Sequence, residues 1–410
     1  MKKCGLNLDY SYSKLPNFFF TITNPKKVIS PKLVLFNDNL ARSLDLDFSL
    51  INETMKADFF SGNILPSNCI PIAQAYAGHQ FGSFTILGDG RAVLIGEHIN
   101  TSNEKFDIQF KGSGITPYSR NGDGRAALSP MLREYLISEA MHSLNIPTTR
   151  SLAVTSTGES VFREKALPGA ILTRIASSHI RVGTFQYAAF KGTLEIQKKL
   201  LDYTINRHYV DIRNTENPAL ELLKSMMSKQ IDLTINWMRI GFIHGVMNTD
   251  NMSIIGETID YGPCAFMDNY NPDTCFSSID YNKRYSYRNQ KIITQWNLAR
   301  FAETLIPFLD KNTKKAVNLA QEIIESFDDL FSRKWKIMMK CKLGIFNNEK
   351  EDDKLINDLL LWMEKKSADY TNTFSYLVSK YKTVDSLYNE NEFNIWYKKW
   401  RDRINRNNKP

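Results

Sequence analysis

Two aspartates and an asparagine lie close together in one polar segment, and their side chains are of the kind that binds a divalent metal ion. Asp250 and Asn251 precede a short apolar run, and a turn at Gly256-Glu257 leads the chain back to Asp260. If this stretch forms a hairpin, the three side chains meet at its open end. Carboxylate and amide oxygens are hard ligands, suited to a magnesium ion that keeps several waters and contacts phosphate oxygens. The segment His244–Gly262 therefore predicts a metal-dependent site for a phosphate-bearing ligand.

The same segment resembles two short elements of protein kinases. Asp260-Tyr261-Gly262 resembles the DFG element, and the stretch from His244 to Asn251 resembles a compressed catalytic loop. Each part alone has an ordinary structural explanation, because an Asp-Asn pair often forms a turn and a lone histidine more often packs than catalyses. Their combination at this spacing favours a functional interpretation.

A lysine and a glutamate upstream have the arrangement of a nucleotide-binding pair. Lys111 ends a stretch in which Phe106, Ile108 and Phe110 alternate with polar residues, so we predict a strand with Lys111 on its polar face. Glu134 follows on a predicted helix among apolar side chains, where an unpaired charge would be costly. Kinases hold nucleotide phosphates with such a strand-end lysine and helix glutamate. An ordinary surface ion pair is the alternative.

Glycine and arginine recur together in the N-terminal half of the chain, as is typical of phosphate binding. The glycines of GDGR at Gly88–Arg91 would let backbone N–H groups approach a phosphate, although a plain turn is the simpler interpretation of a single GxG. Arginine suits bidentate phosphate recognition. Five arginines lie in Gly- and Ser-rich surroundings: Arg91, Arg120, Arg125, Arg174 and Arg181.

The elements that must position these residues are strands followed by a helix. FGSFTIL and RAVLIGEHI flank Gly88-Asp89-Gly90 and predict two strands joined by a hairpin turn. The Gly- and Ser-rich loop at 112–126 is long enough to favour a functional role. SPMLREYLISEAMHSL then predicts a helix with Ser129 as its N-cap and Pro130 at its first position. Its apolar stripe is predicted to contain Met131, Glu134, Ile137 and Met141.

The chain changes character along its length, which predicts an α+β fold. Residues 1–70 predict an irregular extension with short elements, and strong strand patterns begin at Phe81. Beyond about residue 190 the pattern becomes amphipathic and helical, interrupted by the polar stretch 244–280. We therefore expect an N-terminal extension and nucleotide-binding lobe at residues 1–185, and a helical lobe carrying the 244–262 segment at residues 186–410.

The composition is that of an ordinary globular protein. Of the 410 residues, 23% are charged and 42% hydrophobic, which excludes disordered and fibrous classes. The net charge of +8 comes from scattered lysines and arginines and indicates a solvated basic surface rather than a nucleic-acid face.

The five cysteines predict free thiols in a reducing compartment, with a Cys264–Cys275 pair as the alternative. The sequence contains neither a signal peptide nor a long apolar run, so we expect a cytoplasmic protein.

Four long strings, in this order, resemble the selenoprotein O (YdiU) family. They are AYAGHQFGSFTILGDGRA, DIQFKGSGITPYSRNGDGRAALSPMLREYLISEAM, TRIASSHIRVGTFQ and HGVMNTDNMSIIGETIDYGPCAFMD, and the resemblance spans roughly residues 70–300. It implies a protein-kinase-like bilobal fold and a protein adenylyltransferase, which moves AMP from ATP to Ser, Thr or Tyr hydroxyls of proteins and releases pyrophosphate. In that family ATP is inverted, so the α-phosphate meets the acceptor. The residues by themselves indicate only metal-dependent phosphotransfer.

The resemblance also implies a role for each site residue. Asp250 is the proton acceptor for the incoming hydroxyl, and Asn251 and Asp260 hold Mg²⁺ or Mn²⁺. Glu134 is the partner of Lys111. The nucleotide contacts fall on Gly88, Gly90, Arg91, Lys111, Asp123, Gly124, Arg174, Arg181 and Asp260.

Two alternatives and one departure accompany this interpretation. An ordinary kinase would transfer the γ-phosphate, and a pseudokinase scaffold would bind nucleotide without chemistry. Family members carry a cysteine or selenocysteine near the C-terminus, whereas the last cysteine here is Cys341, so we do not expect a C-terminal redox switch. The expected partners are ATP and hydroxyl-bearing proteins, with no nucleic acid and no membrane, and we expect a monomer.

Overall fold

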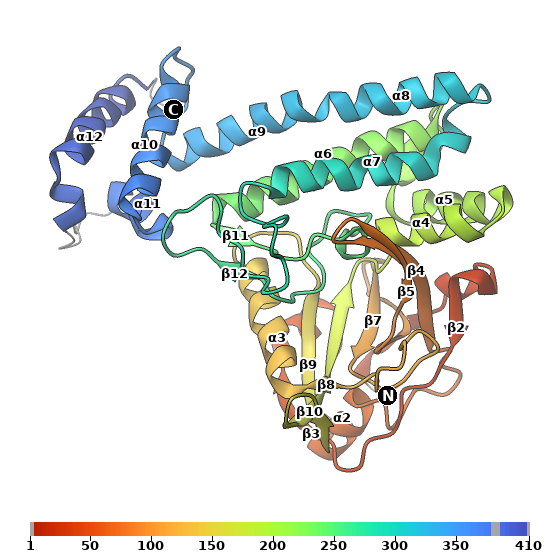
Figure 1. The fold of residues 1–410 in the computed structure, drawn as a ribbon. Helices are drawn as coiled ribbons and strands as arrows, with labels where there is room; N and C mark the ends of the chain where they lie inside the picture. The colour runs from red at the N-terminus through yellow and green to blue at the C-terminus, as the bar shows by residue number, and fades with distance from the viewer. Residues whose placement is uncertain (1–3, 379–385, 408–410) are drawn as a thin grey trace. The chain divides into compact units, whose positions relative to one another are not determined.

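Ten strands form one antiparallel sheet in the N-terminal part of the chain (Figure 1). In spatial order the main strands are β2 (Phe20–Ile22), β4 (Ile72–Gln80), β6 (Ala92–Ile99), β7 (Lys105–Lys111), β10 (Ala166–Ala176), β9 (Arg150–Phe162) and β3 (Lys32–Phe36). At its sides, β1 (Leu8–Asp9) pairs with β6, β5 (Ser83–Gly88) with β4, and β8 (Ala126–Ala127) with β10. β-Branched and aromatic residues recur along these segments, and such side chains pack well on a pleated surface.

Helices dominate the rest of the chain, so the predicted α+β class is confirmed. The computed structural model describes residues 4–378 and 386–407. Its helices are α1 (Asp38–Ser43), α2 (Glu53–Phe60), α3 (Leu128–Ser143), α4 (Val182–Lys191), α5 (Leu194–His208), α6 (Pro218–Arg239), α7 (Gln290–Leu309), α8 (Thr313–Glu325), α9 (Phe327–Lys342), α10 (Asp352–Lys366), α11 (Tyr370–Val378) and α12 (Asn391–Ile404). A second, two-stranded sheet joins β11 (Phe242–Ile243) to β12 (Ala265–Phe266).

The chain divides into two compact units. The first contains residues 1–226, 248–262 and 299–320, and the second contains residues 227–247, 263–298 and 321–410. From Gly88 to Asp260, every residue for which the sequence predicts a nucleotide, metal or catalytic role belongs to the first unit. The predicted division into an N-terminal lobe at residues 1–185 and a helical lobe at residues 186–410 stays a prediction.

The predicted hairpin at Gly88–Gly90 is wrong, although both flanking strands exist. β5 and β6 are each antiparallel to β4, so they run in the same direction and cannot form a hairpin with each other. The hairpin lies earlier, between β4 and β5, where Phe81 and Gly82 have φ angles of 51° and 91° that suit a two-residue type I′ turn. The residues Gly88–Gly90 have the chemistry of a tight turn, but β5 and β6 each pair with β4, and this pairing determines the direction of the chain. Asp89 is buried there, and its carboxylate accepts a hydrogen bond from the Gln74 N–H at 3.1 Å.

The N-terminal segment is more ordered than the predicted irregular extension. β1, β2 and β3 join the main sheet, so part of this segment is built into the fold. Phe59 and Phe60 of α2 enter an apolar core with Ile108 and Phe110 of β7. The rings of Phe59 and Phe110 lie 5.9 Å apart in an edge-to-face arrangement. β7 therefore has one apolar face, as predicted, and its opposite face carries the polar residues.

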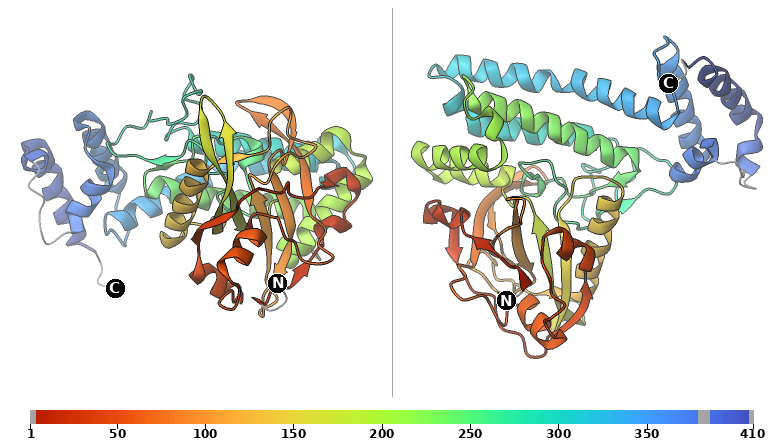
Figure 2. Two further views of the ribbon diagram at one scale, coloured as in Figure 1. Left: turned by 90° about the horizontal axis from the view of Figure 1, so that it is seen from below. Right: turned by 180° about the vertical axis from the view of Figure 1, so that it is seen from behind.

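The helix that carries Glu134 packs on β9 and β10 (Figures 1 and 2). It begins two residues earlier than predicted, because Ala127 is the N-cap and Ser129 and Pro130 already belong to the helix. Ser138 takes the buried position predicted for Ile137, which is half-buried. The buried residues of α3 are Met131, Glu134, Ser138 and Met141.

A buried ion pair fixes the other end of the strand that carries Lys111. Asp107, at the polar face of β7, accepts a hydrogen bond from Arg207 Nη2 of α5 at 2.6 Å, and the Nδ1 and backbone N of His179 both lie 2.9 Å from its Oδ2. Burial would raise the pKa of Asp107, but Arg207 and His179 hold it below its usual value. Burial lowers the pKa of His179 to about 4. This contact ties α5 to β7.

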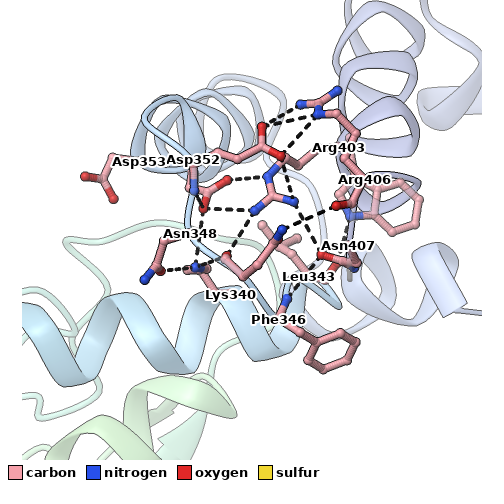
Figure 3. A network of polar contacts seen from close by, with 12 residues as sticks. Lys340, Leu343, Phe346, Asn348, Asp352, Asp353, Arg403, Arg406 and Asn407 are labelled. Atoms are coloured by element: carbon pink, nitrogen blue, oxygen red, sulfur yellow. Dashed lines mark hydrogen bonds and ion pairs between the residues drawn. The ribbon is translucent and has the colours of Figure 1, made fainter. Parts of the chain in front are cut away.

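The second unit has its own buried polar network at the junction of α9, α10 and α12 (Figure 3). Arg403 Nε lies 2.6 Å from Asp352 Oδ1, and the two side chains are 4% and 0% exposed. Lys340 Nζ reaches the same carboxylate at 3.3 Å and Asn348 Oδ1 at 2.5 Å. Because a buried charge is costly without partners, this network fixes α12 against the neighbouring helices.

Two further sequence predictions concern thiols and membranes. None of the five cysteines, all of which lie among the described residues, forms a disulfide, so Cys264 and Cys275 are not bonded to each other. In the part of the chain that the structure describes, no helix combines the length and the apolar character that crossing a bilayer requires.

We predict that His179→Gln flattens the dependence of stability on pH between about 4 and 6.5. The folded chain keeps His179 neutral down to about pH 4, whereas an unfolded histidine protonates near pH 6.5. The unfolded state therefore binds more protons in this window, so the free energy of unfolding of the wild type falls as pH drops. The full contribution is about 3 kcal/mol.

Urea unfolding of wild type and variant at pH 7, 5.5 and 4.5 measures this difference. Carboxylates that titrate in the same range contribute equally to both proteins and cancel in the comparison. Parallel pH profiles of the two proteins would contradict the environment described for His179.

Candidate active site

The predicted pair of Lys111 and Glu134 is present and buried. Nζ of Lys111 lies 2.7 Å from Oε2 of Glu134, and the two side chains are 8% and 2% exposed. This burial excludes the alternative of an ordinary surface pair. β7 places the lysine at its last position, and the buried face of α3 presents the glutamate. Loss of Glu134 would remove one of the two carboxylates that pair with this buried lysine.

The carboxylate of Asp260 lies among three cations. Its Oδ1 is 2.7 Å from Lys111 Nζ and 2.6 Å from Arg174 Nη1, and its Oδ2 is 2.5 Å from Arg181 Nη1. Arg174 Nη1 also lies 3.4 Å from Glu134 Oε1. The three cations thus face two carboxylates, which leaves one positive charge in excess. We name Lys111, Glu134, Arg174, Arg181 and Asp260 the charged cluster.

Asp260 is held in an uncommon state by these neighbours. Burial alone would raise its pKa, but the charges of Arg174, Lys111 and Arg181 hold it well below its usual value. Its backbone φ is 61°, in the left-handed region that non-glycine residues rarely adopt. Such conformations persist where the surrounding contacts hold the residue in place, and they concentrate at functional sites. Here the three ion pairs hold Asp260 in this conformation.

Arg181 connects the two aspartates that the sequence singled out. It lies at the N-cap of α4, 2% exposed, with its guanidinium stacked 4.7 Å from the centroid of the Tyr76 ring. Its Nη1 donates to the backbone oxygen of Asp250 at 2.7 Å and to the side chain of Asp260. One side chain therefore fixes the backbone of the first aspartate and the carboxylate of the second.

Asp250 lies in a short 3₁₀ turn, η5 (Thr249–Asn251), and is 7% exposed. Gln80 Nε2 donates to its Oδ2 at 3.3 Å. Its Oδ1 has no hydrogen-bond partner among the residues that the structure describes. Burial raises the pKa of Asp250 to about 6, although the charge of Arg181 opposes the rise. A buried carboxylate with an unpartnered oxygen is suited to accept a hydrogen bond or a proton from a ligand.

The stretch between residues 250 and 260 does not form the predicted hairpin. Ser253 forms an antiparallel bridge with Arg181, and Thr258 forms a parallel bridge with Thr148. Ser253 and Thr258, on the two sides of the Gly256-Glu257 turn, thus pair with other parts of the chain rather than with each other. The two aspartates are nevertheless brought together, through Arg181.

The stretch Gly88–Arg91 lies beside the charged cluster. The backbone oxygen of Arg91 accepts a hydrogen bond from Gly112 N at 2.7 Å, directly after Lys111. Asp89 Oδ2 accepts from Gln109 Nε2 at 3.2 Å, and Gln109 Oε1 accepts from Arg174 Nη2. Burial raises the pKa of Asp89 to about 6. A chain of hydrogen bonds therefore runs from the glycine-rich stretch to the arginines.

The loop at 112–126 packs back on this stretch. Thr116 Oγ1 donates to the backbone oxygen of Asp89 at 2.7 Å, and Ser119 Oγ donates to that of Gly90 at 2.5 Å. A Cβ at Gly88, whose φ is 155°, would lie 2.4 Å from the Tyr118 ring. Glycine is required at this position because the ring occupies the space of any side chain.

The remaining candidate residues of the loop contact residues outside the charged cluster. Asp123 pairs with Arg163 at 2.8 Å, with both side chains 44% exposed. Gly124 has a φ of 66° and lies against Gly114. Arg125 donates to two backbone oxygens of residues 26–27. Of the five predicted arginines, Arg174 and Arg181 join the cluster, whereas Arg91 and Arg120 are exposed.

Asn251 and Asp260 offer oxygen donors of the type that a magnesium ion binds, and in this structure both oxygens of Asp260 are ion-paired with the cations of the cluster. Asn251 is half-buried beside Asp250, and Asp260 adds a carboxylate that stays anionic. Over the described residues, no group of three or more His, Cys, Asp or Glu side chains forms a larger metal cage. Mg²⁺ is commonly held by one or two protein carboxylates together with substrate phosphates. The donor set is therefore chemically suitable.

Sequence reasoning missed three residues that contact the functional side chains. Gln109 binds Arg174, Tyr76 stacks on Arg181, and Gln80 binds Asp250. The alternation of β7 placed Gln109 on the same face as Lys111, so its role could have been inferred. Tyr76 and Gln80 gave no such signal, because only the path of β4 brings them to their partners.

Comparison with known proteins gives consistent matches over the whole chain. A family model described as protein adenylyltransferase SelO matches residues 3–408. The protein nucleotidyltransferase YdiU of Nitrosococcus oceani is 56% identical over 406 residues, covering 99% of this chain and 82% of that protein. The proteins of the same name from Pelagibacter ubique and Clostridium beijerinckii are 57% and 58% identical, covering 98% of this chain and 83% and 82% of their own lengths.

Solved structures give only weak similarity. The kinase domain of a rhoptry antigen of Toxoplasma gondii covers 64% of this chain and 88% of its own, with 10% identity and a TM-score of 0.26. ROP2 of the same organism, described as having a protein-kinase fold and no enzymatic activity, covers 81% and 86%, with 9% identity and a TM-score of 0.28.

We predict that Asp260→Asn lowers the free energy of unfolding by about 3–5 kcal/mol. The change leaves three buried cations with Glu134 as their single carboxylate partner in the cluster. Asp202→Asn is the control, because its pair with Lys198 is half-exposed and such pairs contribute little. Urea unfolding of both variants and the wild type measures the difference. Equal stability of the two variants would contradict a central role for Asp260.

Proposed function

Because the chain belongs to the protein adenylyltransferase SelO family, it is a nucleotidyltransferase, and we propose that the charged cluster and Asp250 form its active site. In this proposal AMP passes from ATP to a Ser, Thr or Tyr hydroxyl of a target protein. The hydroxyl oxygen bonds to the α-phosphorus, the bond from that phosphorus to the α–β bridging oxygen breaks, and pyrophosphate leaves. Asp250 takes the hydroxyl proton.

The observation that carries the proposal is an excess of buried cationic donors beside an unpartnered carboxylate oxygen. The cluster has one more cation than carboxylate. Among the described residues, the buried Nε atoms of Arg174 and Arg181 and the Oδ1 of Asp250 have no hydrogen-bond partner. Unpaired buried polar atoms are costly. A polyphosphate would match the cationic donors, and a substrate hydroxyl beside it would match the carboxylate of Asp250.

The proposed division of roles follows from charge. Lys111, Arg174 and Arg181 would neutralise phosphate oxygens, and Glu134 would hold Lys111 in place. Transition states of phosphorus transfer need charge neutralisation and positioning more than covalent help. Asp250 would receive the proton, because no lysine or arginine side chain of the cluster forms an ion pair with its carboxylate.

The glycine-rich segments would complete the nucleotide site. Gly88, Gly90 and Arg91 lie next to Lys111 through the backbone contact of Arg91 with Gly112. Asp123 and Gly124 belong to the loop that packs on this stretch, and we propose that they contact the nucleotide from the loop. We also propose residues 1–185 as the nucleotide-binding part of the chain and residues 186–410 as the helical part.

Asn251 and Asp260 would hold a magnesium ion, or manganese in its place. Their amide and carboxylate oxygens are the ligand type that both ions accept. When bound, such an ion supplies positive charge for the phosphate oxygens. The chain's own contribution is to keep Asp260 anionic, which the three neighbouring cations do.

We predict that label from the α-phosphate of ATP, and not from the γ-phosphate, appears on protein. Purified chain is incubated with casein as the hydroxyl-bearing acceptor and ATP labelled at one position or the other. Mass spectrometry then locates the added AMP on casein or on the chain itself. Label from the γ-position alone would establish the kinase alternative instead.

Asp250→Asn distinguishes the enzyme from a nucleotide-binding scaffold. The amide keeps the shape of the side chain but cannot take the proton, and general-base catalysis contributes about 10²- to 10⁴-fold. We expect incorporation of α-label to fall by about that factor, with ATP still bound. Incorporation equal to that of the wild type would favour the scaffold, since the label would then not depend on the proposed catalytic residue.

We predict that chelation with EDTA stops incorporation of AMP and that added Mg²⁺ restores it. Asn251→Ala should raise the Mg²⁺ concentration for half-maximal activity by about tenfold or more, because one of two protein oxygen ligands is lost. Titration of activity against Mg²⁺ measures this shift. The control is Asn236→Ala, which removes an amide whose oxygen accepts from Arg239 within α6 and which belongs to no proposed site. An unchanged Mg²⁺ requirement in Asn251→Ala would contradict its role as a ligand.

A further inference from the structure

The hairpin of β4 and β5 is attached to the turn that carries Asp250. His79 N donates to Thr249 Oγ1 at 2.7 Å, and Thr249 Oγ1 donates to Gln186 Oε1 at 2.6 Å. Gln186 Nε2 lies 2.8 Å from His79 Nδ1, which closes a circuit of three hydrogen bonds. The circuit joins β4, η5 and α4. In addition, Phe81 N donates to the Asn248 side chain at 3.1 Å.

Close packing of backbones completes this attachment. A Cβ at Gly78 would lie 2.2 Å from Asp250 Oδ1, so the strand passes directly against the carboxylate. A Cβ at Gly183 would lie 2.0 Å from the backbone oxygen of Ala77 and 3.3 Å from the Asp250 Cα. Neither position has room for a side chain. The two glycines therefore let β4 and α4 approach the turn closely.

The last residue of β4 is the one whose side chain reaches the carboxylate. Gln80 Nε2 donates to Asp250 Oδ2 at 3.3 Å, while Oδ1 has no hydrogen-bond partner among the described residues. A donor on one oxygen defines the rotation of the carboxylate and so the direction of the other oxygen. Gln80 is itself fixed by the ladder pair with Ser83 and by the tight turn that follows.

We propose that Gln80 is a positioning residue, which together with the close backbone at Gly78 fixes the rotation of the Asp250 carboxylate that takes the proton of the acceptor hydroxyl. The inference rests on the proposed function, since it concerns the same proton transfer. Gln80 contacts neither acceptor nor nucleotide in this proposal. It acts through Asp250, and the circuit of His79, Thr249 and Gln186 holds the turn in register with the strand.

The geometry gives the β4–β5 hairpin a role that its sequence does not suggest. Phe81 and Gly82 make the tight turn, and the strand residues before them carry the contacts to η5. Asp250 is thereby held at two points. Gln80 of β4 binds its carboxylate, and Arg181, at the N-cap of α4, binds its backbone oxygen. A misplacement of about 1 Å can cost about 10² in rate, so such double support matters for catalysis.

The test is Gln80→Leu, which removes the amide donor and keeps a similar volume. We expect kcat for transfer of α-label to casein to fall about 10- to 100-fold, with KM for ATP, ATP affinity by calorimetry and the midpoint of thermal unfolding unchanged. A purely structural hydrogen bond would instead change the unfolding midpoint and leave kcat of the folded enzyme alone. Gln80→Ala is measured beside it, so that the result does not depend on how a leucine packs.

Gln197→Leu is the matched control. Gln197 is half-buried like Gln80, and its amide donates to the backbone oxygen of Gly192, away from Asp250. It should keep wild-type kcat. If both Gln80 variants retain kcat within about twofold of the wild type, or lose ATP affinity or thermal stability in parallel with kcat, the positioning role is overturned.

The same assay separates this inference from the function on which it rests. Transfer of α-label by the wild type with no loss in the Gln80 variants overturns the positioning role alone. Absence of transfer by the wild type, to casein and to the chain itself, overturns both.

Discussion

The ion pairs of Asp260 with Lys111, Arg174 and Arg181 are the interaction on which the site depends. These charges come from β7, from β10 and from the residue that caps α4, so one carboxylate joins three separate elements. Buried cations that lose their partner are strongly destabilising. The sheet, α3 and the 248–262 segment therefore have to fold in mutual register, because no subset of them satisfies the charges by itself.

The same constraint explains why β7 is polar on one face and yet buried on both. Asp107 at one end binds Arg207 of α5, Gln109 in the middle binds Arg174, and Lys111 at the other end binds Glu134. Each polar side chain has an oppositely charged or hydrogen-bonding partner, which offsets the cost of its burial. The apolar face, with Ile108 and Phe110, holds the strand in the core. Stability and site geometry thus share one strand.

What the sequence predicted correctly depended on periodicity and on charge. The alternation before Lys111 gave the strand and its polar face, and an acidic residue within the apolar stripe of α3 required a cation, which Lys111 supplies. What it predicted wrongly was pairing. Gly88–Gly90 and Gly256-Glu257 have the chemistry of turns, but β4 in one case, and the backbones of Arg181 and Thr148 in the other, determine where the chain goes. Such partners lie far away in sequence and leave no local pattern.

The two aspartates of the 248–262 segment show how one short stretch supports two kinds of chemistry. Asp260 has three cations on its carboxylate, which hold its pKa well below the usual value, so it stays anionic. The carboxylate of Asp250 is buried and accepts a hydrogen bond from the side chain of Gln80, and burial raises its pKa to about 6. Arg181 contacts both residues. Its Nη1 donates to the carboxylate of Asp260, but it donates to the backbone oxygen, and not the carboxylate, of Asp250. Environments that move the pKa values of two carboxylates apart in this way distinguish the carboxylate that stays anionic from the carboxylate that can take a proton.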